Sequence, residues 1–153
     1  MAQARDPERF DPNVGILLRE PFLAFSAELL SRLNAAGYDD LRPAHLVVFQ
    51  HIDPAGSRVT ELAARAQLAK PSMSYLVEEL ERRGYLERRL DPTDGRARLV
   101  HLTERGWAEI ADALEIIAAM ETELATVVGD RRWHTLRKLL VDVHVATKGW
   151  SDA

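Results

Sequence analysis

Residues 59–106 carry the strongest structural signal in the chain and read VTELAARAQLAKPSMSYLVEELERRGYLERRLDPTDGRARLVHLTERG. We expect Thr60 to cap a short helix over residues 61–67, because its hydroxyl can accept a hydrogen bond from the first turn. After a short turn, Pro71 opens a second helix that ends near Gly84. Apolar residues recur at helical spacing along this second helix and predict its buried face: Met73, Leu76, Val77 and Leu80.

A β-hairpin is predicted directly after these two helices. Its strands are expected over residues 86–90 and 97–102, with residues 91–96 between them. Asp94-Gly95 favours a hairpin turn, because glycine readily adopts a positive φ angle. Two helices joined by a short turn and followed by a hairpin predict a winged helix-turn-helix. In such a unit the second helix enters the major groove of DNA, and the hairpin (the wing) can reach the neighbouring minor groove.

The charge of the chain is divided unevenly along its length. The 153 residues include 20 Lys and Arg and 24 Asp and Glu, a net charge of −4, which argues against a protein coated in positive charge. Residues 82–105 alone hold seven arginines and four acidic residues, so this region is +3 and the rest of the chain is −7. This partition favours nucleic-acid binding at one face only.

Helices are predicted on both sides of the winged unit. Apolar residues recur every three or four positions from Val14 to Leu33, and within this pattern Pro21 is expected to kink the helix or to start a second one. Pro43 can open another helix, Thr103 can cap a long one, and Asp130 can cap the last. The predicted fold class is therefore mainly α with a small β-hairpin wing.

The predicted domain organisation has three parts. Residues 38–103 form the winged helix-turn-helix DNA-binding lobe, residues 14–37 and 104–147 form a helical dimerisation region, and residues 1–13 form a mobile N-terminal arm. The apolar stripes of the outer helices exceed what one small winged helix needs to cover, which favours a homodimer.

Several other functional classes find no support in the sequence. The chain has no cysteine, which excludes a disulfide framework, cysteine zinc sites and a thiol redox switch. Its five histidines show no zinc-protease spacing, and hydrolase and phosphate-cradling motifs are absent, so we expect no enzyme, no metal site and no cofactor. No apolar run is long enough for a membrane span, and the N-terminus does not read as a signal peptide, which predicts a cytoplasmic protein without a membrane partner.

Four fragments in register make the chain resemble the MarR family of transcriptional regulators, over roughly residues 14–147. They are Glu61-Leu62-Ala63, Leu80-Glu81-Arg82-Arg83-Gly84, Asp94-Gly95-Arg96-Ala97-Arg98 and Leu102-Thr103-Glu104-Arg105-Gly106. The wing signature of the family is D-x-R-x-K/R, and Asp94, Arg96 and Arg98 fill it in order. The resemblance implies a homodimer whose N- and C-terminal helices interlock and whose two recognition helices lie about one DNA turn apart, ~34–36 Å, on a pseudo-palindromic operator.

The resemblance also implies roles for individual residues. Arg96 would enter the minor groove, and Asp94 would support the wing by pairing with Arg96 or Arg98. The residues implied to bind double-stranded DNA are Lys70, Pro71, Ser72, Ser74, Tyr75, Arg96 and Arg98. Many MarR-like regulators release DNA when a small, often aromatic ligand binds, which here favours a ligand-responsive repressor; the residues predicted to line that pocket are Tyr38, His45, Phe49 and Trp107.

One feature of the second helix supports a different function. We expect Glu78 and Glu79 on its outer face, where carboxylates would repel phosphates. The alternative is a winged-helix adaptor that binds another protein and no DNA.

Overall fold

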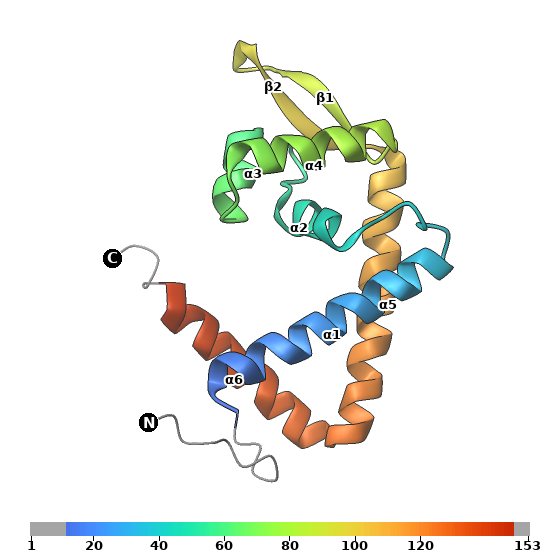
Figure 1. Ribbon diagram of the computed structural model, residues 1–153, viewed down its shortest axis with the longest axis vertical. Helices are drawn as coiled ribbons and strands as arrows, with labels where there is room; N and C mark the ends of the chain where they lie inside the picture. The colour runs from blue at the N-terminus through green and yellow to red at the C-terminus, as the bar shows by residue number, and fades with distance from the viewer. Residues whose placement is uncertain (1–11, 149–153) are drawn as a thin grey trace, which may run out of the picture. The chain divides into compact units, whose positions relative to one another are not determined.

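The computed structural model describes residues 12–148. In chain order its elements are α1 (Val14–Ala35), α2 (Pro43–His51), α3 (Val59–Arg65), α4 (Lys70–Arg82), β1 (Leu86–Asp91), β2 (Asp94–Leu102), α5 (Glu104–Val128) and α6 (Asp130–Lys148) (Figure 1). This order confirms the predicted, mainly helical fold with a two-stranded antiparallel wing. The described residues group into two compact units, one up to Ala113 and one from Leu114. Most of the predicted N-terminal arm, residues 1–11, lies outside the described residues.

Helix α1 runs unbroken through Pro21, so of the two alternatives predicted at this residue, a kink or the start of a second helix, the second is wrong. Pro21 is exposed, and water can therefore bond the carbonyl that proline leaves without an N–H partner. The helix begins at Asn13, whose side chain accepts a hydrogen bond from the Ile16 N–H at 3.1 Å. It ends before Gly37, which has a φ of 107°, as the sequence predicts.

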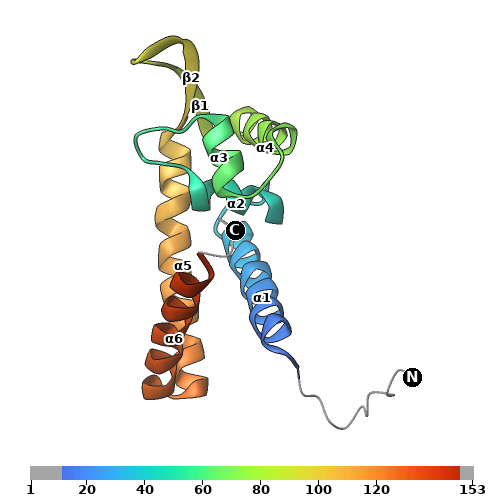
Figure 2. The same cartoon turned by 90° about the vertical axis from the view of Figure 1, so that its left-hand side faces the viewer.

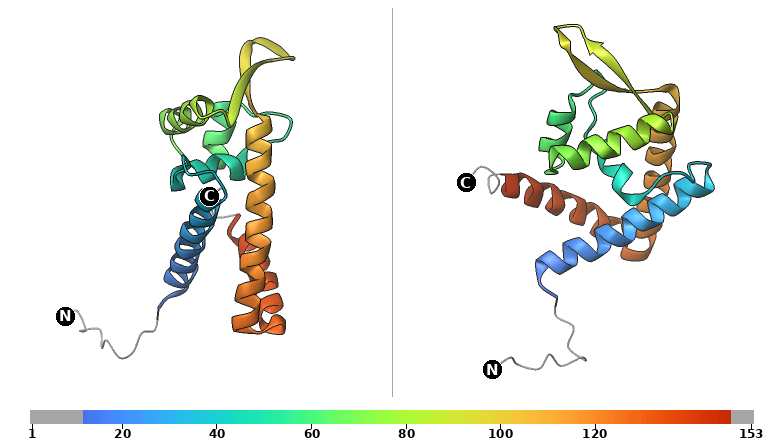
Figure 3. Two further views of the ribbon diagram at one scale, coloured as in Figure 1. Left: turned by 90° about the vertical axis from the view of Figure 1, so that its right-hand side faces the viewer. Right: turned by 45° about the horizontal axis from the view of Figure 1, so that its top comes forward.

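Helices α3 and α4 form the helix-turn-helix and lie side by side, with the hairpin beyond them (Figures 1 and 3). The residue before α3 is Arg58, so the predicted cap at Thr60 is wrong by two positions. The Glu61 carboxylate, in the first turn of α3, accepts a hydrogen bond from the backbone N–H of Arg58 at 3.1 Å and so caps the N-terminus of the helix. Gly84, with a φ of 79°, follows α4 as predicted.

The core of the first unit forms between the helix-turn-helix and the hairpin. All four residues predicted to form the buried face of α4 are buried. They pack in a core that also contains Leu46, Val48, Leu62, Ala63, Tyr85, Leu86, Val100 and Leu102. The apolar face thus holds α4 in place and leaves its opposite face free.

The hairpin turn lies at Pro92 and Thr93, so the predicted turn at Asp94-Gly95 is wrong. Residue pairing runs from Leu86 opposite Leu102 to Asp91 opposite Asp94, which leaves only residues 92 and 93 between the strands. The Asp91 carboxylate accepts hydrogen bonds from the Thr93 backbone N–H at 2.8 Å and from its hydroxyl at 2.7 Å. These hydrogen bonds place the turn at Pro92 and Thr93, before Gly95. Gly95 itself lies in β2 and does not have a positive φ angle.

Helix α5 is capped as predicted by Thr103, whose hydroxyl accepts a hydrogen bond from the Gly106 N–H at 3.2 Å. Gly129, with a φ of 95°, separates α5 from α6, again as the sequence predicts. In the second unit, Arg137 of α6 forms an ion pair with Glu121 of α5. No helix within residues 12–148 combines the length and the apolar character needed to cross a membrane.

Candidate nucleic-acid interface

The exposed side of α4 is polar in its N-terminal half. Lys70, Pro71, Ser72 and Tyr75 are exposed and Ser74 is half-buried, so the structure places all five on the accessible side of this helix. Tyr75 is the largest of them, and 54% of its surface is exposed. No side chain caps the helix at Ala69, so the first-turn N–H groups near Lys70 are open to an anion.

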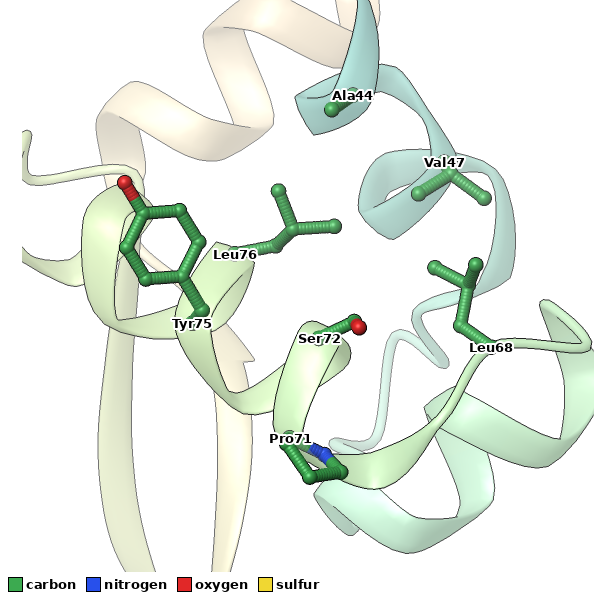
Figure 4. Close-up of a pocket in the computed structure, with 7 residues that line it drawn as sticks. All are labelled: Ala44, Val47, Leu68, Pro71, Ser72, Tyr75 and Leu76. Atoms are coloured by element: carbon green, nitrogen blue, oxygen red, sulfur yellow. The ribbon is translucent and has the colours of Figure 1, made fainter.

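A groove of about 660 Å³ separates this half of α4 from α2. Pro71, Ser72, Tyr75 and Leu76 line it from α4 (Figure 4). Ala44, Val47 and Leu68 form the rest of the wall. The only polar side-chain atoms in the lining are the hydroxyls of Ser72 and Tyr75, and no charged residue contributes.

Glu79 is buried, with 6% exposure, and the expectation that it lies on the outer face beside Glu78 is wrong. Its carboxylate forms ion pairs with Arg42 and, at 3.3 Å, with Arg83. The physical reason is its spacing, because Glu79 follows the buried Leu76 by three positions and so faces α2. Only Glu78 of the two carboxylates remains exposed, which removes half of the acidic surface that favoured a protein-binding adaptor.

His45 completes the contacts of Glu79 and is itself fully buried. Its Nδ1 atom accepts a hydrogen bond from the Arg42 backbone N–H at 3.1 Å, so the neutral ring carries its proton on Nε2 and donates it to Glu79 at 3.2 Å. Burial lowers the pKa of His45. Burial alone would raise the pKa of Glu79, but the His45 hydrogen bond and the charges of Arg42 and Arg83 bring it below its usual value.

The wing is held by Arg58, a residue that the sequence reasoning missed. The Arg58 Nη2 atom lies 2.6 Å from an Asp91 oxygen and 3.5 Å from an Asp94 oxygen. The predicted pairing of the Asp94 side chain with Arg96 or Arg98 is therefore wrong, although Asp94 does accept a hydrogen bond from the Arg96 backbone N–H at 3.2 Å. Hydrogen bonds from Thr93 and Arg58 lower the pKa of Asp91 to about 2, so its carboxylate is charged at neutral pH.

The arginines around the wing fall into two groups. Four of the seven between residues 82 and 105 form ion pairs, namely Arg83, Arg88, Arg89 and Arg105. In the described part of the chain, Arg82, Arg96 and Arg98 form no ion pair, and all three are exposed. Arg96 and Arg98 thus present unneutralised charge on β2, as a phosphate or groove contact requires.

Two of the four residues predicted to line a ligand pocket share a contact with one tyrosine. Tyr38 and Phe49 both pack against Tyr85, with ring centroids 6.3 and 5.8 Å apart. His45 belongs to the Glu79 cluster, and Trp107 is exposed. The structure therefore brings Tyr38 and Phe49 together around Tyr85, and His45 precedes Phe49 by one turn of α2.

Tyr85 organises this aromatic group, although no sequence motif singles it out. Its hydroxyl donates to Asp40 at 2.5 Å, and the Arg105 guanidinium lies 4.3 Å from its ring centre. The Tyr38 hydroxyl donates to Asp112 at 2.6 Å, which together with burial raises the pKa of Tyr38 to about 12. Within residues 12–148, no three His, Asp or Glu side chains are arranged to hold a metal ion.

The sequence pattern of the MarR family matches residues 39–97, which cover α2, the helix-turn-helix and the wing tip. The winged helix-turn-helix of this chain is that of the MarR family. Its members are transcriptional regulators, in agreement with the expectation that the chain is not an enzyme.

Individual MarR-like proteins agree with this assignment. The exopolysaccharide II synthesis transcriptional activator ExpG of Rhizobium meliloti is 28% identical over 129 residues, which are 84% of this chain and 66%, just under two thirds, of ExpG. The transcriptional regulator MhqR of Bacillus subtilis is 26% identical over 71% of the chain and 75% of its own length. The transcriptional repressor CouR, in a structure bound to a 23-mer DNA duplex, superposes with a TM-score of 0.68 at 26% identity, over 86% of this chain and 92% of CouR.

Within the MarR fold, the two exposed surfaces described above are the free side of α4 and the edge of the wing. Both belong to the first unit, and α3, α4 and the hairpin follow one another within it (Figure 2). A MarR-type regulator needs a helix for the major groove and a cation for the minor groove, and these surfaces can provide them.

Proposed function

We propose that this protein is a homodimeric repressor that binds a pseudo-palindromic operator in double-stranded DNA. The observation that carries this proposal is the pair of unneutralised arginines, Arg96 and Arg98, on a wing that Arg58 holds by two acidic contacts. Arg96 would enter the minor groove, where a guanidinium is favoured because it keeps its charge and is weakly hydrated. The relatives include both an activator, ExpG, and a repressor, CouR.

The accessible side of α4 supports the major-groove half of this proposal. Ser72, Ser74 and Tyr75 would meet base edges, and Lys70 with the uncapped N–H groups of the first turn would bind a phosphate. Pro71 would pack against the DNA at the start of the helix. The acidic remainder of the chain would limit binding to other polyanions.

Unpartnered apolar surfaces support a homodimer. Large apolar side chains are exposed along the N-terminal part of α1, at Val14, Leu17, Leu18, Phe22 and Leu23. Helix α6 has no buried residue and exposes Leu136, Leu139, Leu140, Val141, Val143 and Val145. Surfaces of this kind mark protein interfaces, so we assign residues 14–37 and 104–147 to dimerisation and residues 38–103 to DNA binding.

A response to a small aromatic ligand is the further part of the proposal. Tyr38 and Phe49, which share contacts with Tyr85, would form the aromatic wall of such a site, with His45 of α2 and Trp107 of α5 as its other members. Ligand binding there would reduce DNA affinity by favouring a different spacing of the two recognition helices. Because its target is chromosomal DNA, we place the protein in the cytoplasm.

The test is selection of operator sequences from a random duplex pool, followed by titration of the selected duplex with variants. We expect a two-fold symmetric motif and strongly salt-dependent binding. Arg96→Ala should weaken binding by more than about tenfold with the fold unchanged by circular dichroism. Arg89→Ala removes an arginine that is already paired with Glu87 and serves as the matched control, with a smaller loss. Recovery of no sequence at low salt would refute DNA binding, and equal affinity of Arg96→Ala and wild type would remove the wing from it.

A further inference from the structure

We infer that Glu78 is a specificity-determining residue of the DNA interface and that it selects a cytosine in the operator. The inference rests on the proposed function, in which α4 enters the major groove. It assigns a role to the exposed carboxylate of α4, which the DNA contacts proposed above leave unused.

Glu78 lies on the same side of α4 as the residues proposed to meet the bases. The exposed residues of this helix after Lys70 are Pro71, Ser72, Tyr75, Glu78 and Arg82. Tyr75, Glu78 and Arg82 are separated by three and four positions, which is the spacing of neighbours on one face of a helix. Val77 and Glu79, the neighbours of Glu78 in sequence, are both buried. Glu78 is therefore the residue that α4 presents at this turn.

The distance between Glu78 and Tyr75 along the helix fits contacts with neighbouring base pairs. Three residues advance an α-helix by about 4.5 Å, and successive base pairs of DNA are about 3.4 Å apart. Side chains on a helix lean toward its N-terminus. The Glu78 side chain thus leans toward the N-terminal half of α4, which is the part of a recognition helix that meets base edges.

The carboxylate of Glu78 has no partner in the protein. In the part of the chain that the structure describes, it forms no hydrogen bond and no ion pair. The two other carboxylates of α4 are both paired, Glu79 with Arg42 and Glu81 with Arg88. An unpaired carboxylate on a surface that approaches DNA is repelled by the phosphates. Its place there becomes favourable only where the DNA offers it a hydrogen-bond donor.

Cytosine offers such a donor in the major groove. An ionised carboxylate accepts hydrogen bonds and donates none. Guanine presents the acceptors N7 and O6 and thymine presents the acceptor O4, whereas cytosine presents the N4 amino donor. Adenine has an amino donor at N6, but the N7 acceptor beside it would repel the second carboxylate oxygen. Glu78 should therefore favour cytosine over the other bases at the position that it contacts.

The test uses the operator recovered by selection and a series of duplexes in which each base pair of one half-site is replaced in turn. Affinities are measured by fluorescence anisotropy at one salt concentration, for wild type, Glu78→Ala, Glu78→Gln and Glu104→Gln. Glu104→Gln is the matched control, because Glu104 is exposed on α5 and its replacement removes the same charge from the same compact unit. Since both positions are exposed, every variant should keep the circular dichroism spectrum and melting temperature of wild type.

Wild type and Glu104→Gln should lose about tenfold in affinity at one position when its cytosine is replaced, the effect of one hydrogen bond to a charged group. Glu78→Ala should lose less than about twofold there. It should also bind duplexes with other bases at that position more tightly than wild type does, because no carboxylate then faces their acceptors. Glu78→Gln should move the preference from cytosine to adenine, since an amide can donate to N7 and accept from N6. A residue that only stabilised the fold would not change the preferred base at one position.

Three results would overturn the inference. The first is a Glu78→Ala protein that keeps the cytosine preference of wild type. The second is a Glu78→Ala protein whose affinity changes by the same factor for every duplex, which would leave the carboxylate a purely electrostatic effect. The third is a selected operator with no cytosine at any position that responds to Glu78. A wild-type protein that selects no duplex refutes the proposed function itself, whereas an operator that is read independently of Glu78 refutes only this inference.

Discussion

Replacing Glu109 by glutamine should stabilise the protein at alkaline pH and leave its stability nearly unchanged at acidic pH. Glu109 lies on α5, is 1% exposed, and its Oε2 atom has no hydrogen-bond partner. Burial, together with the nearby Asp112, raises the pKa of its carboxyl from 4.5 to about 7. A buried carboxyl without a partner favours its neutral form, and glutamine is a neutral side chain of the same shape.

The direction and the size of this change in the free energy of unfolding follow from proton linkage at Glu109. Because the folded pKa is higher than the unfolded one, the folded state binds the proton more tightly, and its advantage is fully present below pH 4.5. The advantage is lost as the pH rises from 4.5 through about 7 and is then constant. The difference between those two pKa values corresponds to an upper limit of about 3 kcal/mol in the free energy of unfolding. Water that reaches the carboxylate on ionisation reduces this amount.

The assay is urea unfolding followed by circular dichroism at a fixed protein concentration, across the range from acidic to alkaline pH. Wild type should lose stability over this range more steeply than Glu109→Gln, and the gap between them should reach about 2–3 kcal/mol at the alkaline end. Glu115→Gln, a change at an exposed position of the same helix, controls for the loss of one carboxylate. A constant gap between wild type and Glu109→Gln at every pH would refute the assignment of a buried, unpartnered carboxyl.

Two further substitutions test the close contacts of the winged unit. Gly106→Ala should destabilise the protein by about 2 kcal/mol in thermal unfolding, because a Cβ atom would lie 2.3 Å from the Tyr85 carbonyl oxygen, although alanine is normally the better helix former. Gly95→Ala meets nothing within 4 Å and should leave the melting temperature unchanged, so an equal effect of the two would contradict the close approach at Gly106. Arg58→Met should weaken operator binding about fivefold with little change in melting temperature, because Asp91 and the hairpin turn lose the cation that orients the wing. Full affinity of this variant in a titration would show that the contact is dispensable.

The order of the elements could be predicted from the sequence because its signals are local. Apolar spacing along α4 and the positions of Gly37, Gly84 and Gly129 depend on neighbouring residues only, and each is confirmed. Thr103 also lies in a local capping motif that needs no distant partner. Features of this kind are specified within one or two helical turns.

The errors arise where a side chain finds a partner outside its own segment or a competing local motif. The sequence predicted Glu79 at the surface, whereas in the fold α2 places His45 beside its carboxylate. The sequence predicted the hairpin turn at Asp94-Gly95, but the Asp91 carboxylate accepts a hydrogen bond from Thr93 and places the turn before these residues. Arg58, which lies 33 positions before Asp91 in the chain, holds the same carboxylate. Long-range ion pairs leave no periodic trace in one sequence, so a residue such as Arg58 cannot be found from it. The exposure of the polar positions on the free side of α4 and of the wing arginines follows from local patterns and could be predicted.

The pairing of arginines with carboxylates also changes the meaning of the net charge. A sum of −4 over the chain, or +3 over residues 82–105, weights every arginine equally. In the structure, Arg83, Arg88, Arg89 and Arg105 are already neutralised by carboxylates or bound to them, and such groups gain less from a phosphate. Within residues 82–105 the arginines without an ion pair lie at the end of α4 and along β2. The attraction to DNA depends on where such arginines lie, and the total count of basic residues is a poor guide to it.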